Sequence, residues 1–114
     1  DTVRGFIEVA MCDNCLGEVT NVGSGFEISI KETLEIIEEI TGKSLDVHIE
    51  AERLRPDKSE VYRLIADISK AEKLFNWKSK FSGREGLKAG LEKTVEWFGQ
   101  LENLQKYPAE GYVI

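Results

Sequence analysis

The sequence predicts an α/β fold of mixed helices and short strands in a single domain. Apolar residues with helical spacing follow Ser-x-x-Glu sequences at three places, and such capping boxes mark the starts of helices. Two other segments alternate apolar and polar residues, as half-buried strands do. A chain of 114 residues is long enough for one hydrophobic core and too short for two.

The N-terminal part is expected to form a helix followed by a strand. Apolar residues recur at helical spacing from Val3 to Ala10, which predicts a helix from about Thr2 to Cys12. The β-rich segment Glu18–Val22 alternates and runs into a glycine turn, which predicts a strand. Because a natural chain rarely begins inside its own first helix, we expect this one to be a piece of a longer protein.

The next pair of elements is again a helix and a strand. Ser29 and Glu32 form a capping box, and Gly42 is a favoured C-terminal cap, so a helix is expected between them. Its expected buried residues are Leu34, Ile37 and Ile40. Strict alternation over Leu45–Glu50 predicts a half-buried strand with His48 on its polar face.

The C-terminal part is expected to be mainly helical. After a short strand within Val61–Ala66, capping boxes at Ser69–Glu72 and Ser82–Glu85 predict a short helix through Phe75 and then a long one. The long helix is expected to present one apolar face, formed by Leu87, Leu91, Val95, Phe98 and Leu101. We expect one domain over residues 1–104 and a loosely ordered tail over residues 105–114, which contains proline and glycine and lacks periodicity.

Composition restricts the classes of partner. The chain has 15 Lys and Arg residues against 21 Asp and Glu residues, a net charge of −6, which disfavours non-specific binding to nucleic acid or to anionic membranes. No apolar run is long enough for a membrane span, and no signal peptide opens the chain. These observations lead us to expect a cytoplasmic protein.

Most of the residues that suggest chemistry have a simpler explanation. Cys12 and Cys15 have the spacing of a redox or zinc motif, but His48 is the only other soft ligand, so we expect reduced thiols and no metal site. No spacing pairs His48 with a nucleophile, so we expect no catalytic residue. The turn Val22–Gly25 lacks the third glycine of a dinucleotide motif. Its small residues favour close packing, with ligand binding as the weaker alternative.

One loop differs from the acidic background. Four of the fifteen basic residues fall between positions 53 and 63, namely Arg53, Arg55, Lys58 and Arg63. Guanidinium groups suit diphosphate oxygens because each donates two parallel charge-assisted hydrogen bonds, and Glu60 could accept from ribose hydroxyls. The alternative is a solvated loop whose charges pair with Asp57 and Glu60.

An ordered set of motifs resembles a known enzyme family. The segments are Asp1–Phe6, Gly17–Gly25, Glu27–Ile30, Arg53–Val61, Ala66–Ala71, Phe75–Trp77, Arg84–Leu87 and Glu96–Phe98. Together they are similar to the C-terminal part of NAD-dependent nucleotide-sugar epimerases and dehydratases, the extended short-chain dehydrogenase/reductases. The form Arg-Leu-Arg-Pro-x-Lys-Ser-Glu-Val most resembles bacterial NAD-dependent 4,6-dehydratases that act on a UDP-linked N-acetylhexosamine. This resemblance implies the substrate-binding part of an extended Rossmann-type fold.

The resemblance also implies roles for individual residues. Arg55 matches the arginine that contacts the diphosphate of the nucleotide sugar, and Glu60 is the candidate contact to the nucleotide ribose. Two extra residues in the loop make the match of Glu60 less direct. Arg63 is an unmatched helper, and Arg53 completes the candidate substrate-binding set.

The catalytic parts of that family are not in this sequence. Its glycine-rich NAD motif, its Tyr-x-x-x-Lys and its Ser/Thr precede the matched region, and neither Tyr62, Tyr107 nor Tyr112 is followed by lysine four residues later. The resemblance therefore implies NAD in the intact parent and none bound by this chain. The implied partners are a nucleotide sugar, an N-terminal Rossmann domain and a possible second copy of the chain. The alternatives are a stand-alone non-catalytic binding module and, more weakly, a small redox protein that uses Cys12 and Cys15.

Overall fold

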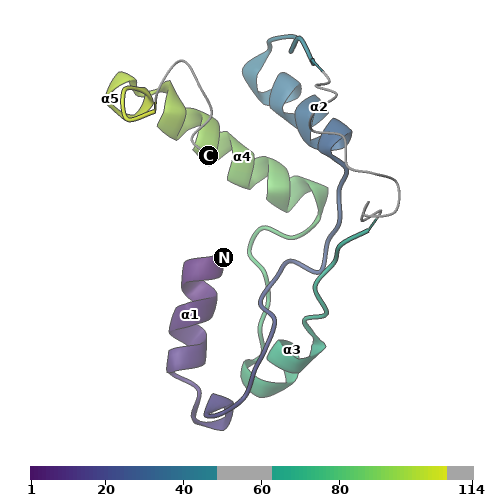
Figure 1. Ribbon diagram of the computed structural model, residues 1–114, viewed down its shortest axis with the longest axis vertical. Helices are drawn as coiled ribbons and strands as arrows, with labels where there is room; N and C mark the ends of the chain where they lie inside the picture. Colours follow the sequence, from purple (N-terminus) through teal and green to yellow (C-terminus); the bar gives the residue numbers. More distant parts are fainter. Residues whose placement is uncertain (49–62, 108–114) are drawn as a thin grey trace.

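Helices account for all the regular secondary structure in the computed structural model, which describes residues 1–48 and 63–107 (Figure 1). In chain order the elements are α1 (Thr2–Ala10), the 3-10 helix η1 (Asp13–Cys15), α2 (Ile30–Thr41), α3 (Ser69–Phe75), α4 (Gly83–Gly99) and α5 (Leu101–Leu104). The four longer helices are those that the sequence predicts.

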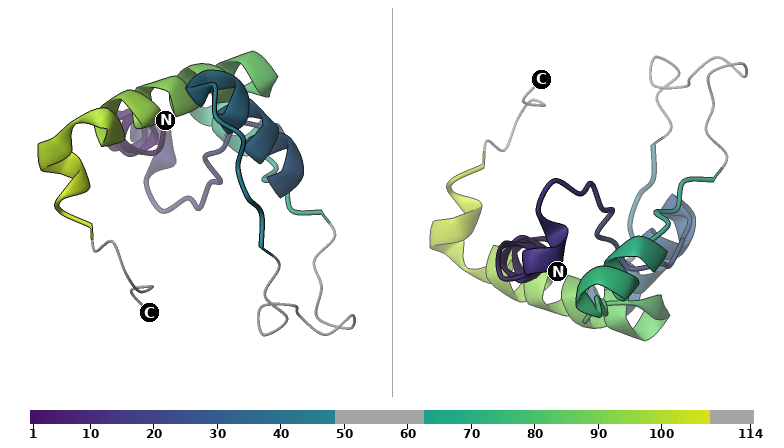
Figure 2. Two further views of the ribbon diagram at one scale, coloured as in Figure 1. Left: turned by 90° about the horizontal axis from the view of Figure 1, so that it is seen from above. Right: turned by 90° about the horizontal axis from the view of Figure 1, so that it is seen from below.

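The helices gather at two ends of the molecule, and extended chain joins them. α1, η1 and α3 lie at one end, and α2 lies beside α4 at the other (Figures 1 and 2). Lys88 and Arg84 of α4 both pair with Glu39 of α2, at 2.6 and 3.8 Å. The extended segments 17–29 and 63–68 run between the two ends. The packing of these two segments against each other therefore determines how the two groups of helices are arranged.

The boundaries of α2 are those that its sequence predicts. The Ser29 hydroxyl accepts a hydrogen bond from the Glu32 amide at 3.1 Å, and the Glu32 carboxylate accepts one from the Ser29 amide at 3.0 Å. Gly42 ends the helix with a φ of 65°, a left-handed conformation that favours glycine. The predicted buried face is wrong in detail, because Ile36 is fully buried while Leu34, Ile37 and Ile40 are only half-buried.

α3 and α4 begin without the capping boxes that the sequence predicts at Ser69 and Ser82. Ser69 lies inside α3, where its amide donates to the Asp67 carboxylate at 3.0 Å. Ser82 is the N-cap of α4, but its hydroxyl donates to the Ser24 carbonyl at 2.7 Å and so joins two segments. A tertiary contact has therefore replaced the local cap.

The long helix ends earlier than its apolar pattern predicts. Gln100 adopts an extended conformation, with a ψ of 121°, and separates α4 from α5. The Trp97 carbonyl accepts from the Gln100 amide at 3.3 Å and also from the side chain of the buried Asn103 at 3.0 Å, which connects the end of α4 to α5. Leu101 consequently starts a new turn and lies exposed instead of extending the apolar face.

The predicted strands are not present among the described residues. Residues 18–22, 45–48 and 63–66 have no strand assignment, and the rest of the predicted strands over Leu45–Glu50 and Val61–Ala66 lies outside the described part. A strand needs a neighbour whose backbone completes its hydrogen bonds. Within residues 1–48 and 63–107 no backbone-to-backbone hydrogen bond joins two of these extended segments. The α/β expectation is thus confirmed only for its helices.

Side chains make the connections that a β-ladder would otherwise make. The Asn21 amide group donates to the Asp67 carbonyl at 3.4 Å, and the Lys70 ammonium donates to the Val19 carbonyl at 2.7 Å. Segments 19–25 and 66–70 therefore lie side by side without pairing as strands.

Glycine makes this close approach possible. A Cβ on Gly23 would lie 3.1 Å from the Cβ of Ala66, and one on Gly25 would lie 3.2 Å from Cδ1 of Ile68. The close-packing interpretation of the turn Val22–Gly25 is confirmed. Gly5 plays the same part in α1, since a Cβ there would lie 2.5 Å from Cγ1 of Val22.

Trp77 is the largest fully buried side chain of the described residues. Its indole N–H donates to the Gly23 carbonyl at 2.8 Å. The Arg4 guanidinium lies 4.6 Å from the ring centroid, and Phe75 meets the ring edge-on at 6.3 Å. Trp77 thereby connects α1, the glycine turn and the end of α3.

Replacement of Trp77 tests this junction. Trp77→Phe keeps most of the apolar volume but removes the hydrogen bond to Gly23, so we expect the free energy of unfolding to fall by about 1–3 kcal/mol. Trp97→Phe is the matched control, because Trp97 is 39% exposed, and we expect a change below about 1 kcal/mol. Urea denaturation measures both values. Equal losses in the two variants would contradict the role given to Trp77.

A second variant pair tests how α4 is seated. A Cβ on Gly86 would lie 2.6 Å from the backbone carbonyl carbon of Phe81, whereas one on Gly99 would meet no atom within 4 Å. Gly86→Ala is expected to destabilise the chain by about 1–3 kcal/mol, because backbone cannot move aside cheaply. Gly99→Ala in the same helix should be neutral or stabilising. A lower melting temperature for Gly99→Ala than for Gly86→Ala would be inconsistent with this packing.

Candidate functional site

One of the four predicted substrate-binding residues lies in the described part of the chain. Arg53, Arg55 and Glu60 fall within residues 49–62, outside the described residues. Arg63 follows directly after that segment and belongs to the described residues. The structure therefore describes only the border of the predicted loop, and the substrate-binding assignments of all four residues stay predictions.

Arg63 forms a bidentate ion pair with Glu27. Its Nε and Nη2 atoms donate to the two carboxylate oxygens of Glu27 at 3.1 and 2.5 Å. These hydrogen bonds lower the pKa of Glu27 and raise the pKa of Arg63, so both groups stay charged. The fork-to-fork geometry is the one that an arginine uses with a phosphate. In this structure, however, the Glu27 carboxylate already accepts both hydrogen bonds of the guanidinium.

The ion pair of Arg63 differs from the pairing that the solvated-loop alternative predicts. That alternative expected the basic residues to pair with Asp57 and Glu60 nearby in sequence. The observed partner lies 36 residues away, on the segment before α2. Sequence reasoning missed Glu27 because no local pattern connects it with Arg63. Only the packing of segments 19–25 and 66–70 brings their neighbours together.

A surface hollow of about 870 Å³ adjoins this pair at the start of α2. Segment 26–30, Glu32, Arg63 and Leu64 line it. Among the described residues its charged groups are two carboxylates and one guanidinium, so this part of its lining is formally negative. Hydrogen bonds from Ser29 lower the pKa of Glu32 and keep it ionised at the helix N-terminus. An anionic ligand would bind here only with further positive charge, and the predicted ligands Arg53 and Arg55 lie outside the described residues.

The turn Val22–Gly25 does not fit a dinucleotide phosphate. Ala66 and Ile68 fill the space beside Gly23 and Gly25, and the Gly23 carbonyl accepts from the Trp77 indole. A phosphate cradle needs free backbone N–H groups and open space. This turn therefore does not fit the diphosphate of NAD.

The remaining candidates lie apart from this hollow. His48 is 81% exposed and pairs with Asp46 at 3.0 Å, so the expectation of a surface histidine is confirmed. Cys12 and Cys15 are joined as a disulfide, which corrects the expectation of two reduced thiols. The physical reason is the η1 turn, which holds their Cα atoms 5.4 Å apart. In the described ranges no three His, Cys, Asp or Glu side chains gather into a possible metal site.

Comparison with curated proteins finds several relatives. UDP-glucuronate 4-epimerase of Thermodesulfobacterium geofontis is 42% identical over 81 residues, which is 70% of this chain and 23% of the relative. The putative UDP-glucose 4-epimerase of Methanocaldococcus jannaschii is 37% identical over 87 residues, which is 76% of this chain and 26% of the relative. UDP-N-acetyl-alpha-D-glucosaminuronate decarboxylase of Bacillus cytotoxicus is 31% identical over 105 residues, which is 90% of this chain and 31% of the relative.

The coverage of these matches is asymmetric. They include most of this chain, which spans less than a third of the length of each of the three relatives. A match over 70% or more of 114 residues cannot leave out positions 53–63, so the basic loop lies within the matched region. No protein-family model and no solved structure matches the chain.

The ion pair between Arg63 and Glu27 can be tested by titration. At pH values above the ordinary glutamate pKa, the ion pair stabilises the folded chain. This stabilisation is lost as the pH falls through the lowered pKa of Glu27 in the folded chain. Arg63→Gln should therefore raise the pKa of Glu27 towards the ordinary glutamate value, as measured by NMR titration. Arg84→Gln, which removes a partner of Glu39, should leave Glu27 unchanged. An unaltered Glu27 pKa in Arg63→Gln would show that the pair does not persist in solution.

Proposed function

The chain belongs to the NAD-dependent epimerase/dehydratase family of nucleotide-sugar enzymes, and we propose that it forms the part of such an enzyme that binds the nucleotide sugar. The observation that carries this proposal is the similarity over most of the chain to enzymes named for UDP- and GDP-linked sugars. These relatives are named for different reactions, but the name of each includes a sugar linked to UDP or GDP. The shared requirement is recognition of that nucleotide diphosphate.

We assign this recognition to the basic loop. Arg55 clamps the diphosphate through two charge-assisted hydrogen bonds, and Glu60 accepts from the ribose hydroxyls. Arg53 adds positive charge to an otherwise acidic surface. Arg63 can contribute only by exchanging the Glu27 carboxylate for a phosphate oxygen, so Arg55 makes the main contact.

The formal charge of the hollow beside Arg63 supports a combined site. Glu27 and Glu32 make that hollow negative, which would repel a diphosphate approaching it alone. The arginines of the loop supply the missing charge. Carboxylates beside the phosphate-binding arginines are then available to accept hydrogen bonds from ribose or sugar hydroxyls.

We further propose that this chain acts on substrate positioning and not on the bond-making steps. It lacks the Tyr-x-x-x-Lys sequence, and its glycine turn does not fit NAD. In the complete enzyme NAD would transiently accept a hydride from the sugar, in a Rossmann domain outside this sequence. The residues of this chain bind and orient the sugar nucleotide next to that domain. The loop form favours a 4,6-dehydratase or an epimerase acting on a UDP-linked sugar.

An exposed apolar surface is the proposed contact with that Rossmann domain. It comprises Val3, Phe6 and Val19, which are between 73% and 84% exposed. Apolar groups of this number on α1 and the segment after it indicate an interaction surface. The relatives are at least three times longer than the stretch matched here, which provides the domain that would cover it. In the absence of that domain the same surface would favour association between copies of the chain.

Substitution of Arg55 tests the assignment. In the complete enzyme, Arg55→Ala is expected to weaken the binding of UDP-N-acetylglucosamine about 10- to 100-fold, since a charge-assisted contact contributes about 1.5–3 kcal/mol. Isothermal titration calorimetry measures this affinity. The matched control is Arg84→Ala, because Arg84 lies on α4 and pairs with Glu39. Its affinity should equal that of the wild type.

The ligand series separates the possible failures. The wild type should bind UDP-N-acetylglucosamine and UDP more tightly than UMP, because UMP lacks the second phosphate. If the complete protein binds none of the three, the proposed function is wrong. If it binds them and Arg55→Ala binds equally well, Arg55 is not in the site. If the 114-residue chain alone binds as tightly as the complete protein, the stand-alone binding module replaces the enzyme part.

A further inference from the structure

Cys12 and Cys15 flank a single turn at the end of α1. Cys12 is the N-cap of η1 and Cys15 is its last residue. The Cys15 amide donates to the Cys12 carbonyl at 3.0 Å, and the two Cα atoms lie 5.4 Å apart. Disulfides require a Cα separation of about 4.4–6.8 Å. A backbone hydrogen bond that does not depend on the sulfur atoms thus holds the residues at disulfide distance.

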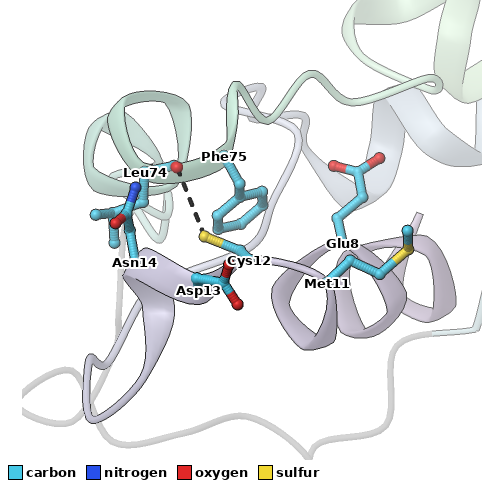
Figure 3. Close-up of a pocket in the computed structure, with 7 residues that line it drawn as sticks. All are labelled: Glu8, Met11, Cys12, Asp13, Asn14, Leu74 and Phe75. Atoms are coloured by element: carbon cyan, nitrogen blue, oxygen red, sulfur yellow. Dashed lines mark hydrogen bonds between the residues drawn. The ribbon is translucent and has the colours of Figure 1, made fainter.

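The two sulfur atoms differ in accessibility. Cys15 is 7% exposed and belongs to the small core of the described chain. Cys12 is half-buried and lines a surface hollow of about 480 Å³ together with Glu8, Met11 and Phe75 (Figure 3). Thiol–disulfide exchange depends on which sulfur an incoming thiolate can reach. The hollow gives access to Cys12.

We propose that Cys12 and Cys15 form a reversible disulfide that is opened and closed by exchange at Cys12, a redox modification site separate from the nucleotide-sugar site. In the opening direction the thiolate of a dithiol attacks Cys12 Sγ, and the bond to Cys15 breaks. Cys15 leaves as a thiolate and takes up a proton. The second thiol of the dithiol then releases Cys12, so the dithiol becomes a disulfide and both cysteines become thiols. A low-molecular-weight disulfide reverses the exchange and is reduced to two thiols.

The redox state of Cys12 determines whether this residue can donate a hydrogen bond to α3. Its Sγ atom lies 3.6 Å from the Leu74 carbonyl oxygen, and Figure 3 shows it between that oxygen and the Phe75 ring. A thiol S–H can donate a hydrogen bond to this carbonyl, whereas a disulfide sulfur has no proton to donate. The Leu74 carbonyl lies in the last turn of α3, three residues before Trp77. Opening the disulfide therefore exchanges a covalent link within η1 for a hydrogen bond between η1 and α3.

Alkylation and mass spectrometry test the reversibility. The folded chain is equilibrated in buffers with different ratios of reduced to oxidised glutathione and then treated with iodoacetamide. We expect one transition between a species without alkylated cysteine and a species with two, reached from both directions. Two alkylated cysteines at every ratio would show that the disulfide does not form. If both cysteines remain unalkylated after the folded chain has been treated with dithiothreitol and then with iodoacetamide, exchange does not occur in the folded chain.

Single variants test the site of attack. Cys15→Ser leaves only Cys12, and Cys12→Ser leaves only Cys15. We expect Cys12 to react with an aromatic disulfide reagent at least tenfold faster than Cys15 in the folded chain. Equal rates, or a faster reaction of Cys15, would overturn the assignment of Cys12 as the exchange site.

The melting temperature gives a readout that nucleotide-sugar binding does not influence. We expect the wild type to melt a few degrees higher in oxidising than in reducing buffer, because the disulfide restricts the unfolded chain. The double variant Cys12→Ser/Cys15→Ser should melt at the same temperature in both buffers. A shift in the double variant, or none in the wild type, would contradict a switch at this pair. These results are independent of whether Arg55 binds a diphosphate.

Discussion

The hydrogen bond from the buried Trp77 indole to the Gly23 carbonyl is the contact on which the arrangement of the chain depends. A buried indole N–H needs an acceptor, because an unsatisfied donor in an apolar environment is costly. The acceptor comes from a segment 54 residues earlier in the chain, so burial of Trp77 fixes that segment against the end of α3. The Arg4 guanidinium lies over the ring and adds α1 to the same junction. Few other contacts can substitute for this one, because the buried apolar residues of the described chain are Cys15, Ile36, Ala71 and Trp77.

The candidate site is a consequence of that junction. Once the Gly23 backbone is fixed, Gly23 and Gly25 allow Ala66 and Ile68 to approach within van der Waals contact. The chain on either side then has little freedom, and Glu27 and Arg63 meet a short distance beyond the contact. Arg63 follows the basic loop directly in sequence, and Glu27 is the residue with which it pairs. The small side chains at this turn thereby lead to a defined position for a charged pair beside the proposed binding loop.

The sequence predicted local structure well and tertiary contacts poorly. The start and end of α2 followed from Ser29, Glu32 and Gly42, because all three act within one or two helical turns. The capping boxes at Ser69 and Ser82 failed because Asp67 and Ser24 provided better partners, and Ser24 is 58 residues away from Ser82. The strands failed for a related reason, since alternation reports a preference for extended backbone but not the presence of a pairing neighbour. At the candidate site, the spacing of the basic residues made Arg63 a candidate, but it could not point to Glu27, which meets Arg63 only through the packing of two distant segments.

The charge distribution explains why substrate binding would need the basic loop and the described framework together. The framework supplies rigid placement and carboxylates but too little positive charge for a diphosphate, and the loop contains four basic residues within eleven positions of an acidic chain. A loop alone would lose much of its binding energy to ordering, whereas a framework alone would repel the ligand. Relatives named as 4-epimerases and as a decarboxylase all match this region. Such a division is what we expect of a part that recognises the nucleotide diphosphate common to these substrates, because that recognition places few constraints on the reaction carried out at the sugar.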